Sequence, residues 1–204
     1  MKSFRIEICG GIASGKTTLA NLLAGPDTKL VLENFQTNPF WQAFYADPVG
    51  TAFETEVSFL LQHYHEVKTS KNPNHKLVCD FSMYLDLAYA HVTLDQDKLE
   101  AFLASYREVE KELTAPSLLI HLRCDPEIEL ERIRNRGREV EKSITIGYLQ
   151  QINKWLEQVL IERAFPGDQL VIDSGMLDFV HDEDMKQAIL DQVSIKISSG
   201  TQFL

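Results

Sequence analysis

The sequence predicts an α/β fold in which a parallel sheet is covered by helices on both faces. Short apolar runs alternate with segments of helical periodicity along the chain. These runs are hydrophobic at successive positions, as expected for parallel strands that are buried on both faces. A glycine-rich loop follows the first run and precedes the first helical segment. A strand, a glycine-rich loop and a helix in this order are typical of nucleotide-binding α/β proteins.

Each expected element has its own local signal. The strands are short runs rich in β-branched and other apolar residues, and we place them at 4–9, 29–32, 76–79, 117–122 and 169–172. The helices repeat apolar residues every three or four positions, and we place them at 16–24, 52–69, 84–91, 95–113, 126–135 and 145–164. Gly25-Pro26 is expected to end the first helix, and Asp125-Pro126 to begin the fifth. Residues after Ser174 carry no clear pattern.

The composition predicts a globular protein of one domain over residues 1–204. Hydrophobic residues make up 44% of the chain and charged residues 25%, which is ordinary for such a domain. No apolar run approaches the roughly 20 residues needed to cross a bilayer, and the first residues do not resemble a signal peptide. Cys9, Cys79 and Cys124 follow no metal or disulfide spacing. Free thiols of this kind indicate a reducing compartment, so we expect a cytoplasmic protein.

The charge excludes one class of partner. The formal net charge is −10, whereas proteins that bind nucleic acid polymers are usually basic or carry a long basic stripe. The one basic cluster, at 132–138, is short. It is suited to a small phosphorylated ligand.

The loop at residues 10–17, GGIASGKT, matches the pattern G-x-x-x-x-G-K-[S/T] of a P-loop. Its backbone N–H groups and the following helix N-terminus would surround phosphates, Lys16 would reach the β and γ phosphates, and Thr17 would hold Mg²⁺. The guanine-reading motif Asn-Lys-x-Asp is absent, which argues against a GTPase. The expected ATP-binding residues are Gly10, Gly11, Ile12, Ala13, Ser14, Gly15, Lys16, Thr17 and Thr18.

Two acidic residues directly follow apolar runs. Glu33 comes after the second run and Asp80 after the third. The carboxyl ends of parallel strands meet at one edge of the sheet, where ligands bind. We therefore expect Glu33 to accept a proton from an acceptor hydroxyl and Asp80 to bind the metal. The alternative for each is a helix-capping or turn residue.

An arginine-rich segment follows at about 132–145. Its arginines could close as a lid over the phosphates and neutralise charge during phosphoryl transfer. The alternative is a solvated helix face in which the arginines pair with nearby glutamates. The arginines are Arg132, Arg134, Arg136 and Arg138, and the glutamates are Glu129, Glu131, Glu139 and Glu141.

Taken in order, these motifs resemble the deoxynucleoside kinase family. The matching blocks are the P-loop, Glu33, 38–40 (NPF), 44–48 (FYADP), 80–86 (DFSMYLD), 132–138 (RIRNRGR) and Glu141. The resemblance implies a three-layer P-loop fold with a five-stranded parallel sheet, and a homodimer. It also implies transfer of the γ-phosphoryl of ATP, with Mg²⁺, to the 5′-hydroxyl of a deoxynucleoside.

The resemblance also implies individual roles. Glu33 corresponds to the base that deprotonates the 5′-hydroxyl, and Tyr45 and Glu141 to residues that hold the sugar 3′-hydroxyl. Asp86 corresponds to an aspartate near the nucleobase. The lid arginines on the phosphates would be Arg132, Arg136 and Arg138.

Three positions depart from the family pattern. Phe81 stands where the family has an arginine, for which Arg134 and Arg123 are the possible substitutes. Glu56 replaces a glutamine that reads the base, and His63 replaces another arginine. Glu56 and His63 share one helical stripe with Leu60, at i, i+4 and i+7. The neighbouring stripe is expected to face the core, and it consists of Phe53, Val57, Leu61 and Tyr64.

These departures affect the predicted acceptor. An ionised Glu56 can only accept hydrogen bonds, so together with Asp86 it favours a base edge rich in N–H donors, such as guanine. We therefore expect a preference for purines, unless His63 pairs with Glu56. Two other functions stay open because of Phe81. One is a kinase of a nucleoside monophosphate or another small hydroxyl compound, and the other is a catalytically weak nucleotide-binding regulatory module.

Overall fold

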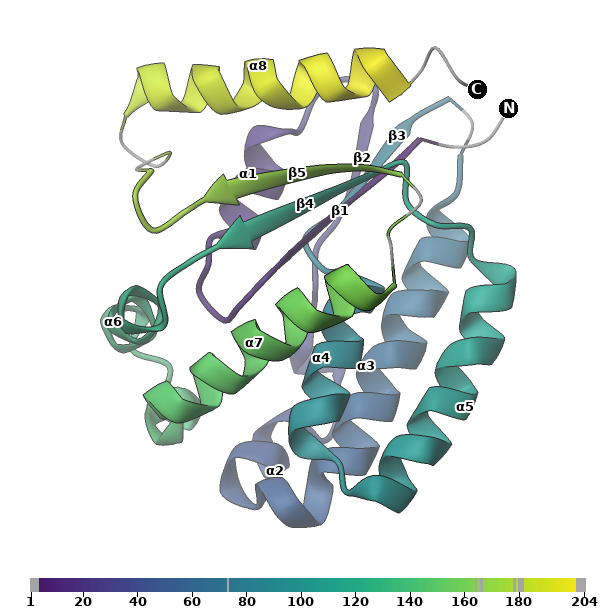
Figure 1. The fold of residues 1–204 in the computed structure, drawn as a ribbon, viewed down its shortest axis with the longest axis vertical. Helices are drawn as coiled ribbons and strands as arrows, with labels where there is room; N and C mark the ends of the chain where they lie inside the picture. Colours follow the sequence, from purple (N-terminus) through teal and green to yellow (C-terminus); the bar gives the residue numbers. More distant parts are fainter. Residues whose placement is uncertain are drawn as a thin grey trace.

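Five parallel strands form a sheet at the centre of the molecule (Figure 1). In the computed structural model the described residues are 4–72, 74–163, 165, 167–177, 179 and 182–200, with side chains up to residue 198. The order of the strands is β2-β3-β1-β4-β5, which confirms the predicted five-stranded parallel sheet. The strands are β1 (Arg5–Gly10), β2 (Thr28–Val31), β3 (Lys76–Cys79), β4 (Leu118–Arg123) and β5 (Asp168–Asp173).

The first strand lies in the middle of the sheet. In the register of the sheet, Ile6 of β1 is opposite Val78 of β3 on one side and Leu118 of β4 on the other. The chain therefore leaves β1 toward one edge, through β2 and β3, and returns to fill the other edge with β4 and β5. Open α/β sheets bind ligands at such a reversal, outside the carboxyl ends of the strands.

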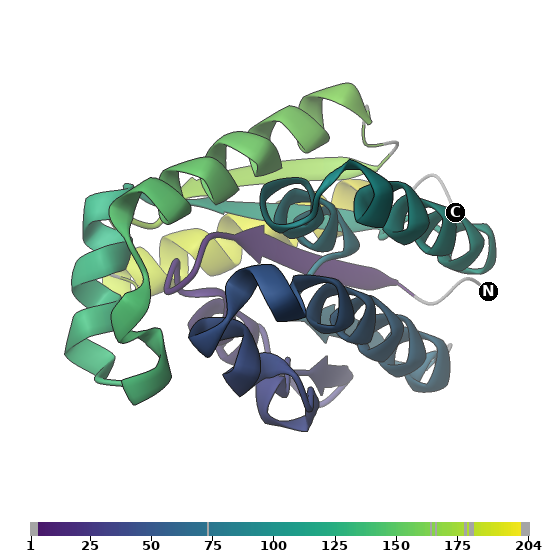
Figure 2. The ribbon, with the colours of Figure 1, turned by 90° about the horizontal axis from the view of Figure 1, so that it is seen from below.

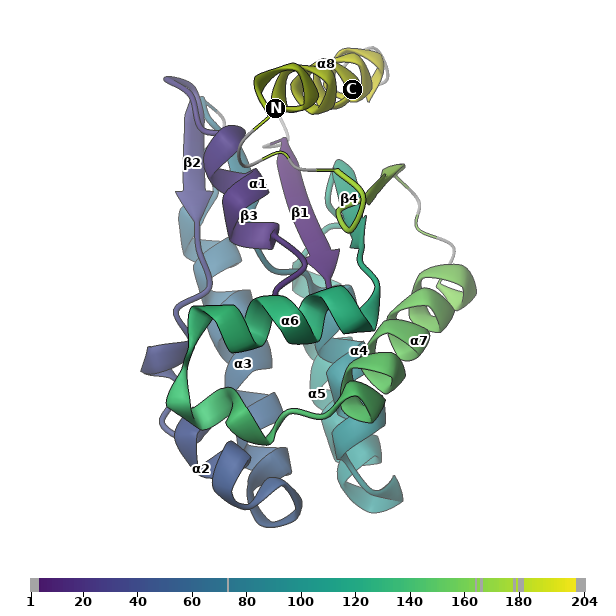
Figure 3. The same cartoon turned by 90° about the vertical axis from the view of Figure 1, so that its left-hand side faces the viewer.

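Helices cover both faces of this sheet and form the outer two layers (Figures 1 and 2). One face carries α3 (Pro48–Ser70), α4 (Met83–Thr93), α5 (Gln96–Glu112) and α7 (Ile146–Glu162). The other carries α1 (Lys16–Leu22) and α8 (Glu183–Gly200). In Figure 3, α6 (Pro126–Arg136) runs across the carboxyl ends of the strands. The short elements beside the site are α2 (Trp41–Ala46) and the 3₁₀ turns at Phe35–Thr37 and Glu139–Ser143.

The strands are apolar on both faces because each face is the floor of a separate core. On one face, Cys79 and Leu119 belong to a buried cluster with Leu60 of α3. On the other face, Ile8 lies in a cluster with Leu19 of α1. All five of these residues are fully buried, with 0% of their surface exposed. The expectation of a sheet buried on both sides is confirmed.

Capping residues fix where several helices begin. Asp125 accepts a hydrogen bond from the backbone N–H of Glu127 at 2.8 Å, with Pro126 as the first residue of α6, as expected. Asp47 does the same for α3 through the N–H of Gly50 at 3.0 Å. The first helix ends at Leu22, two residues before the predicted end.

Two expectations about helices were incomplete or wrong. The sequence patterns missed α2, α8 and both 3₁₀ turns. In α3, the stripe expected to face the core is only partly buried, and Leu61 is 49% exposed. The buried stripe is that of Glu56, Leu60 and His63, because this side of α3 faces α4 and the end of the sheet. No helix in the described residues is long and apolar enough to span a membrane.

Candidate active site

A cavity of about 440 Å³ opens at the carboxyl ends of the strands. It brings together every residue predicted from the sequence to act in catalysis, acceptor binding or metal binding. Of the predicted P-loop residues, Gly10, Gly11 and Ser14 form the turn of the loop without lining the cavity. The predicted residues that line it are Ile12, Ala13, Gly15, Lys16, Thr17, Thr18, Glu33, Tyr45, Glu56, His63, Asp80, Asp86, Arg132, Arg136, Arg138 and Glu141.

The P-loop joins β1 to α1 through a left-handed backbone. The φ angles of Gly10 and Gly15 are 153° and 101°, a region that L side chains rarely adopt, and Ala13 also has a positive φ of 62°. Lys16 Nζ donates to the carbonyl oxygens of Gly10 at 2.9 Å and Gly11 at 2.8 Å. Burial lowers the pKa of the Lys16 ammonium, and nearby carboxylates, led by Glu33, act against this. A phosphate group would give this buried cation a stronger partner.

A buried carboxylate supports the loop from behind. Glu129 of α6 is 0% exposed, and its Oε2 accepts a hydrogen bond from Asn153 Nδ2 of α7 at 3.1 Å. Burial raises the pKa of Glu129 to about 8. The sequence alternative placed Glu129 on a solvated helix face, paired with an arginine. This alternative is wrong for Glu129, which is buried. The absence of a side chain at Gly11 leaves the room that Glu129 occupies.

Replacing Gly11 by alanine is expected to destabilise the protein by about 1–3 kcal/mol and to weaken ATP binding. An added Cβ would overlap Glu129 Oε1 and Asn153 Oδ1, so these two side chains would have to shift and their hydrogen bond would be disturbed. The control is Gly147→Ala in α7, where the nearest atom to a new Cβ is Thr145 Oγ1 at 4.0 Å. Thermal unfolding and ATP titration of both variants provide the measurement. Equal stability and affinity in the two variants would contradict this packing.

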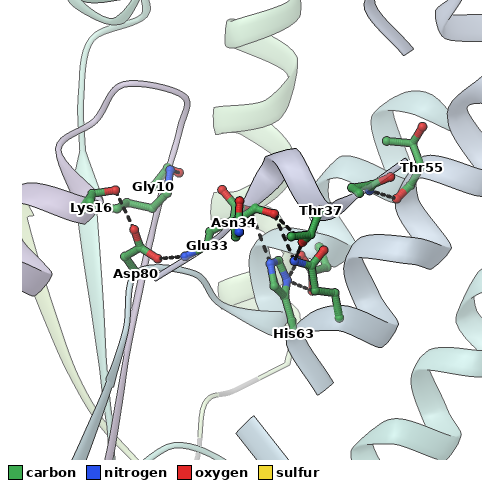
Figure 4. Close-up of polar contacts among 12 residues, drawn as sticks. Gly10, Lys16, Glu33, Asn34, Thr37, Thr55, His63 and Asp80 are labelled. Atoms are coloured by element: carbon green, nitrogen blue, oxygen red, sulfur yellow. Dashed lines mark hydrogen bonds and ion pairs between the residues drawn. The ribbon is translucent and has the colours of Figure 1, made fainter. Parts of the chain in front are cut away.

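Asp80 connects the P-loop to the end of β2. Its Oδ2 accepts a hydrogen bond from Thr17 Oγ1 at 2.6 Å, and its Oδ1 accepts one from the backbone N–H of Glu33 at 2.5 Å. Figure 4 shows Asp80 between the loop and Glu33. The cap of α4 is Ser82, whose Oγ accepts from the N–H of Tyr84 at 3.2 Å, so Asp80 is not the capping residue.

The oxygens of Thr17 and Asp80 are suitable ligands for Mg²⁺, which prefers hard oxygen donors. Among the described residues, no three His, Cys, Asp or Glu side chains form a cluster that could hold a metal. A magnesium ion that arrives with a nucleotide needs no such cluster, because phosphate and water oxygens complete its coordination. The donor set at this point of the cavity is therefore consistent with a nucleotide-bound Mg²⁺.

Glu33 leaves the end of β2 and faces His63 (Figure 4). The distance from Glu33 Oε1 to His63 Nε2 is 3.3 Å, and the Glu33 side chain is 34% exposed. Burial acts to raise the pKa of Glu33, but the hydrogen bond and charge of His63, together with Lys16 and Arg138, lower it. Glu33 is therefore an ionised carboxylate in contact with the cavity.

His63 also contacts Asp86 of α4. Its Nδ1 is 3.0 Å from both carboxylate oxygens of Asp86, and its ring stacks on Phe81 with centroids 4.0 Å apart and planes at 8°. Glu56 has a different partner, since Thr93 Oγ1 donates to its Oε1 at 3.1 Å. From the sequence, His63 could have paired with Glu56. In the structure, His63 contacts Glu33 and Asp86 instead.

Two of the three predicted lid arginines converge on one carboxylate. Arg136 Nε is 2.7 Å from Glu141 Oε2, and Arg138 Nη1 is 3.2 Å from Glu141 Oε1. The Arg138 guanidinium also lies over the ring of Phe35, at 4.3 Å from its centroid. Glu141 is only 3% exposed, whereas the side chains of Arg136 and Arg138 are 29% and 40% exposed, so these pairs lie at the rim of the cavity. The i,i+3 pair of Arg138 with Glu141 is one that the alternative of arginine–glutamate pairing predicts. Gly137, with a φ of 67°, ends α6 between the two arginines.

The other arginines differ in position. Arg132 Nη2 donates to the carbonyl oxygen of Ser174 at 2.8 Å, which holds Arg132 beside the P-loop. Arg134 does not line the cavity. Arg123 pairs with Glu157 at 3.3 Å near the surface. Neither Arg134 nor Arg123 takes the place of the arginine that Phe81 replaces.

Sequence reasoning missed the aromatic wall of the acceptor side. Flat apolar rings can stack on a nucleobase, and Tyr45 joins them through an edge-to-face contact with Trp41 at 5.8 Å. Burial, together with the charge of Glu141, raises the pKa of the Tyr45 hydroxyl. The hydroxyl therefore keeps its proton and can donate a hydrogen bond. The density of aromatic residues at 35–45 could have indicated part of this wall from the sequence. The missed residues are Phe35, Trp41, Phe44, Phe59, Tyr89 and Tyr148.

Comparison with known proteins identifies the family to which this chain is similar. The family model for deoxynucleoside kinase matches residues 6–198. A deoxyguanosine kinase of Bacillus subtilis (strain 168) is 29% identical over 184 residues, covering 86% of this chain and 88% of the relative. A deoxyadenosine kinase of Dictyostelium discoideum is 28% identical and covers 93% of this chain and 79% of the relative. Deoxyadenosine kinase from M. mycoides with bound dCTP superposes with a TM-score of 0.80 at 20% identity, covering 94% of this chain and 99% of that chain.

The fold and the loop define a P-loop nucleotide-binding protein. The chain belongs to the deoxynucleoside kinase family, as its match over residues 6–198 shows. It is an enzyme that transfers the γ-phosphoryl of ATP to a deoxynucleoside. The regulatory-module alternative is therefore set aside.

Proposed function

We propose that this kinase phosphorylates purine deoxynucleosides at the 5′-hydroxyl, with Glu33 as the base. The supporting observation is the position of Glu33. It lies in the same cavity as Lys16 and Thr17 and is connected to the P-loop through Asp80. A hydroxyl bound beside Glu33 would give its proton to the carboxylate while its oxygen attacks the γ phosphorus and the bond to the β-phosphate oxygen breaks.

The donor half of the site would hold ATP with its magnesium. The backbone amides of the P-loop and the ammonium of Lys16 would bind the phosphates, while Thr17 and Asp80 would hold Mg²⁺, which would supply charge neutralisation. Arg132, Arg136 and Arg138 close from the lid and stabilise the charge on the transferred group.

The acceptor half would bind sugar and base separately. Tyr45 and Glu141 lie together at the lid side of the cavity, where they would hold the 3′-hydroxyl. Glu56, on the buried stripe of α3, would face the edge of the base. The aromatic wall would stack on the faces of the base.

The protonation of Glu56 refines the predicted base preference. Burial raises the pKa of Glu56 to about 8, although the hydrogen bond from Thr93 acts to lower it. Near neutral pH the side chain is mostly a carboxylic acid, which both donates and accepts, and not the acceptor-only group assumed from the sequence. The purine preference is supported by the deoxyguanosine and deoxyadenosine kinases among the relatives. Ionised Glu56 would favour guanine, which offers N1–H and an exocyclic amine.

The ratio of kcat/KM for deoxyguanosine over deoxyadenosine is expected to rise as the pH increases through about 8. The sign follows because the raised pKa leaves Glu56 neutral below this pH and ionised above it. Turnover of all four deoxynucleosides between pH 6 and 9.5 provides the measurement. The control is Glu56→Gln, which cannot ionise and should give a constant ratio. A preference for thymidine would contradict the purine proposal.

Assembly and location are further parts of this proposal. We propose a homodimer of a single-domain kinase, residues 1–204, in the cytoplasm. Cys9, Cys79 and Cys124 are free thiols, which suits a reducing compartment. Both hydrophobic clusters pack on one sheet, which supports a single domain. Sedimentation equilibrium of the purified chain tests the dimer.

A further inference from the structure

The imidazole of His63 is held from four sides. Its two nitrogens face the carboxylates of Glu33 and Asp86, which come from β2 and α4. Phe81 stacks on one face of the ring, and Phe59 lies 5.9 Å away at 32°. The side chain is 2% exposed, so water does not compete for either nitrogen. The ring therefore has one orientation.

The two carboxylates determine the protonation of this ring. A neutral imidazole donates from one nitrogen and accepts at the other, so one of its lone pairs would point at a carboxylate. Only the imidazolium can donate to both Glu33 and Asp86. Burial alone would lower the pKa of His63, but the charges and hydrogen bonds of Asp86 and Glu33 raise it to about 10. The three residues together carry one net negative charge.

We propose that His63 is a positioning residue that aims Glu33 at the acceptor hydroxyl, and that Asp86 anchors His63 for this task. The inference rests on the proposed role of Glu33 as the base. His63 Nε2 lies 3.3 Å from Glu33 Oε1 and, when protonated, would hold this oxygen. The backbone N–H of Glu33, which donates to Asp80 Oδ1, fixes the main chain. This leaves Oε2 for the hydroxyl proton. Since both oxygens of Asp86 contact His63, Asp86 acts mainly through His63 and Glu56 is left as the polar reader of the base.

His63 also has an electrostatic consequence for Glu33. An imidazolium in contact keeps the carboxylate ionised in a surrounding that is otherwise rich in acidic groups. Besides Asp86, the charged groups that act on Glu33 and His63 are Glu56 and Glu66 of α3, Asp80 after β3, Lys16 of α1 and Arg138 of the lid.

The test compares His63→Phe with the unaltered enzyme. Phenylalanine keeps the stack on Phe81 and removes both donors. We expect kcat to fall by about 10²-fold, with the KM for ATP unchanged. The reason is that a Glu33 carboxylate that no longer points at the acceptor hydroxyl slows only the chemical step. The KM for the deoxynucleoside should change far less than kcat, because the acceptor is still bound while its hydroxyl is no longer oriented toward the base. In Asp86→Asn, activity should fall above neutral pH, because His63 then loses its proton in that range.

A measurement on the unaltered protein does not depend on how the variants fold. The ¹⁵N and ¹H signals of the His63 imidazole should show two protonated nitrogens at pH 8, and a neutral ring there would overturn the inference. An unchanged kcat in a folded His63→Phe variant would also overturn it. If Glu33→Gln remains active, the base role fails and the inference fails with it. If Glu33→Gln is inactive and His63→Phe behaves like the unaltered enzyme, only the inference on His63 fails.

Discussion

Replacing Glu33 by glutamine is expected to lower kcat by about 10²- to 10⁴-fold, the usual contribution of a general base. The amide has nearly the same shape as the carboxylate but cannot accept the hydroxyl proton at neutral pH. Its oxygen can still accept a hydrogen bond from His63, so the local structure should survive. ATP affinity should be unchanged, because the P-loop and Asp80 keep their contacts. Steady-state turnover of deoxyguanosine and ATP titration measure the two effects separately.

The matched control is Glu54→Gln. Glu54 lies on the same helix as His63, is exposed, and does not line the cavity. The Glu54→Gln substitution should leave kcat and KM unchanged. A Glu33→Gln enzyme that retained most of its kcat would show that another group accepts the proton.

The second large effect is expected at the lid, where Arg136→Gln should lower kcat by about 10²- to 10³-fold, as the loss of one charge-stabilising donor does. Arg136 is held by Glu141 at 2.7 Å at the wall of the cavity, where it can meet the charge that develops on the transferred phosphoryl. Glutamine is shorter and uncharged, so it removes both the charge and the reach of the guanidinium. Single-turnover kinetics at saturating ATP isolate this chemical step from product release.

Arg134→Gln is the control for Arg136→Gln. It removes the same charge from the same helix at a position that is exposed and outside the cavity. Its kcat should remain close to that of the unaltered enzyme. Equal losses in the two variants would mean that the net charge of the lid matters and the position of Arg136 does not.

The fold was largely predictable because its signals are local. The five apolar runs and the P-loop define a parallel sheet, and the strand at Lys76–Cys79 was predicted residue for residue. The helix α8 was missed although Ile189 and Val193 recur at helical spacing and are buried, so a usable signal was overlooked. In α3 the most buried stripe contains Glu56 and His63, whereas Val57 and Tyr64 of the expected core stripe pack against the core from partly buried positions. Apolar periodicity therefore found part of the core side but not the most buried face.

The residues of the site were predictable as a set, but their partners were not. Glu33 and Asp80 were found because both follow strands, and the sheet brings strand ends together. The contact of His63 with Glu33 joins residues of two elements that only tertiary packing brings together. Burial of Glu129 behind Gly11 depends in the same way on how α6 crosses the strand ends. The spacing of residues along the sequence contains no information about such tertiary contacts.

The central position of β1 has a consequence for folding. The strand that leads into the P-loop is made first, yet its partner β4 lies more than half a chain away, with Ile6 opposite Leu118. Pairings between residues so distant in sequence form slowly, because the entropy of closing the loop is lost before the contacts are gained. On the ribosome, the nucleotide site therefore cannot assemble until β4 has emerged. Until then β1 is a hydrophobic strand with one free edge, which makes this stage the most prone to aggregation.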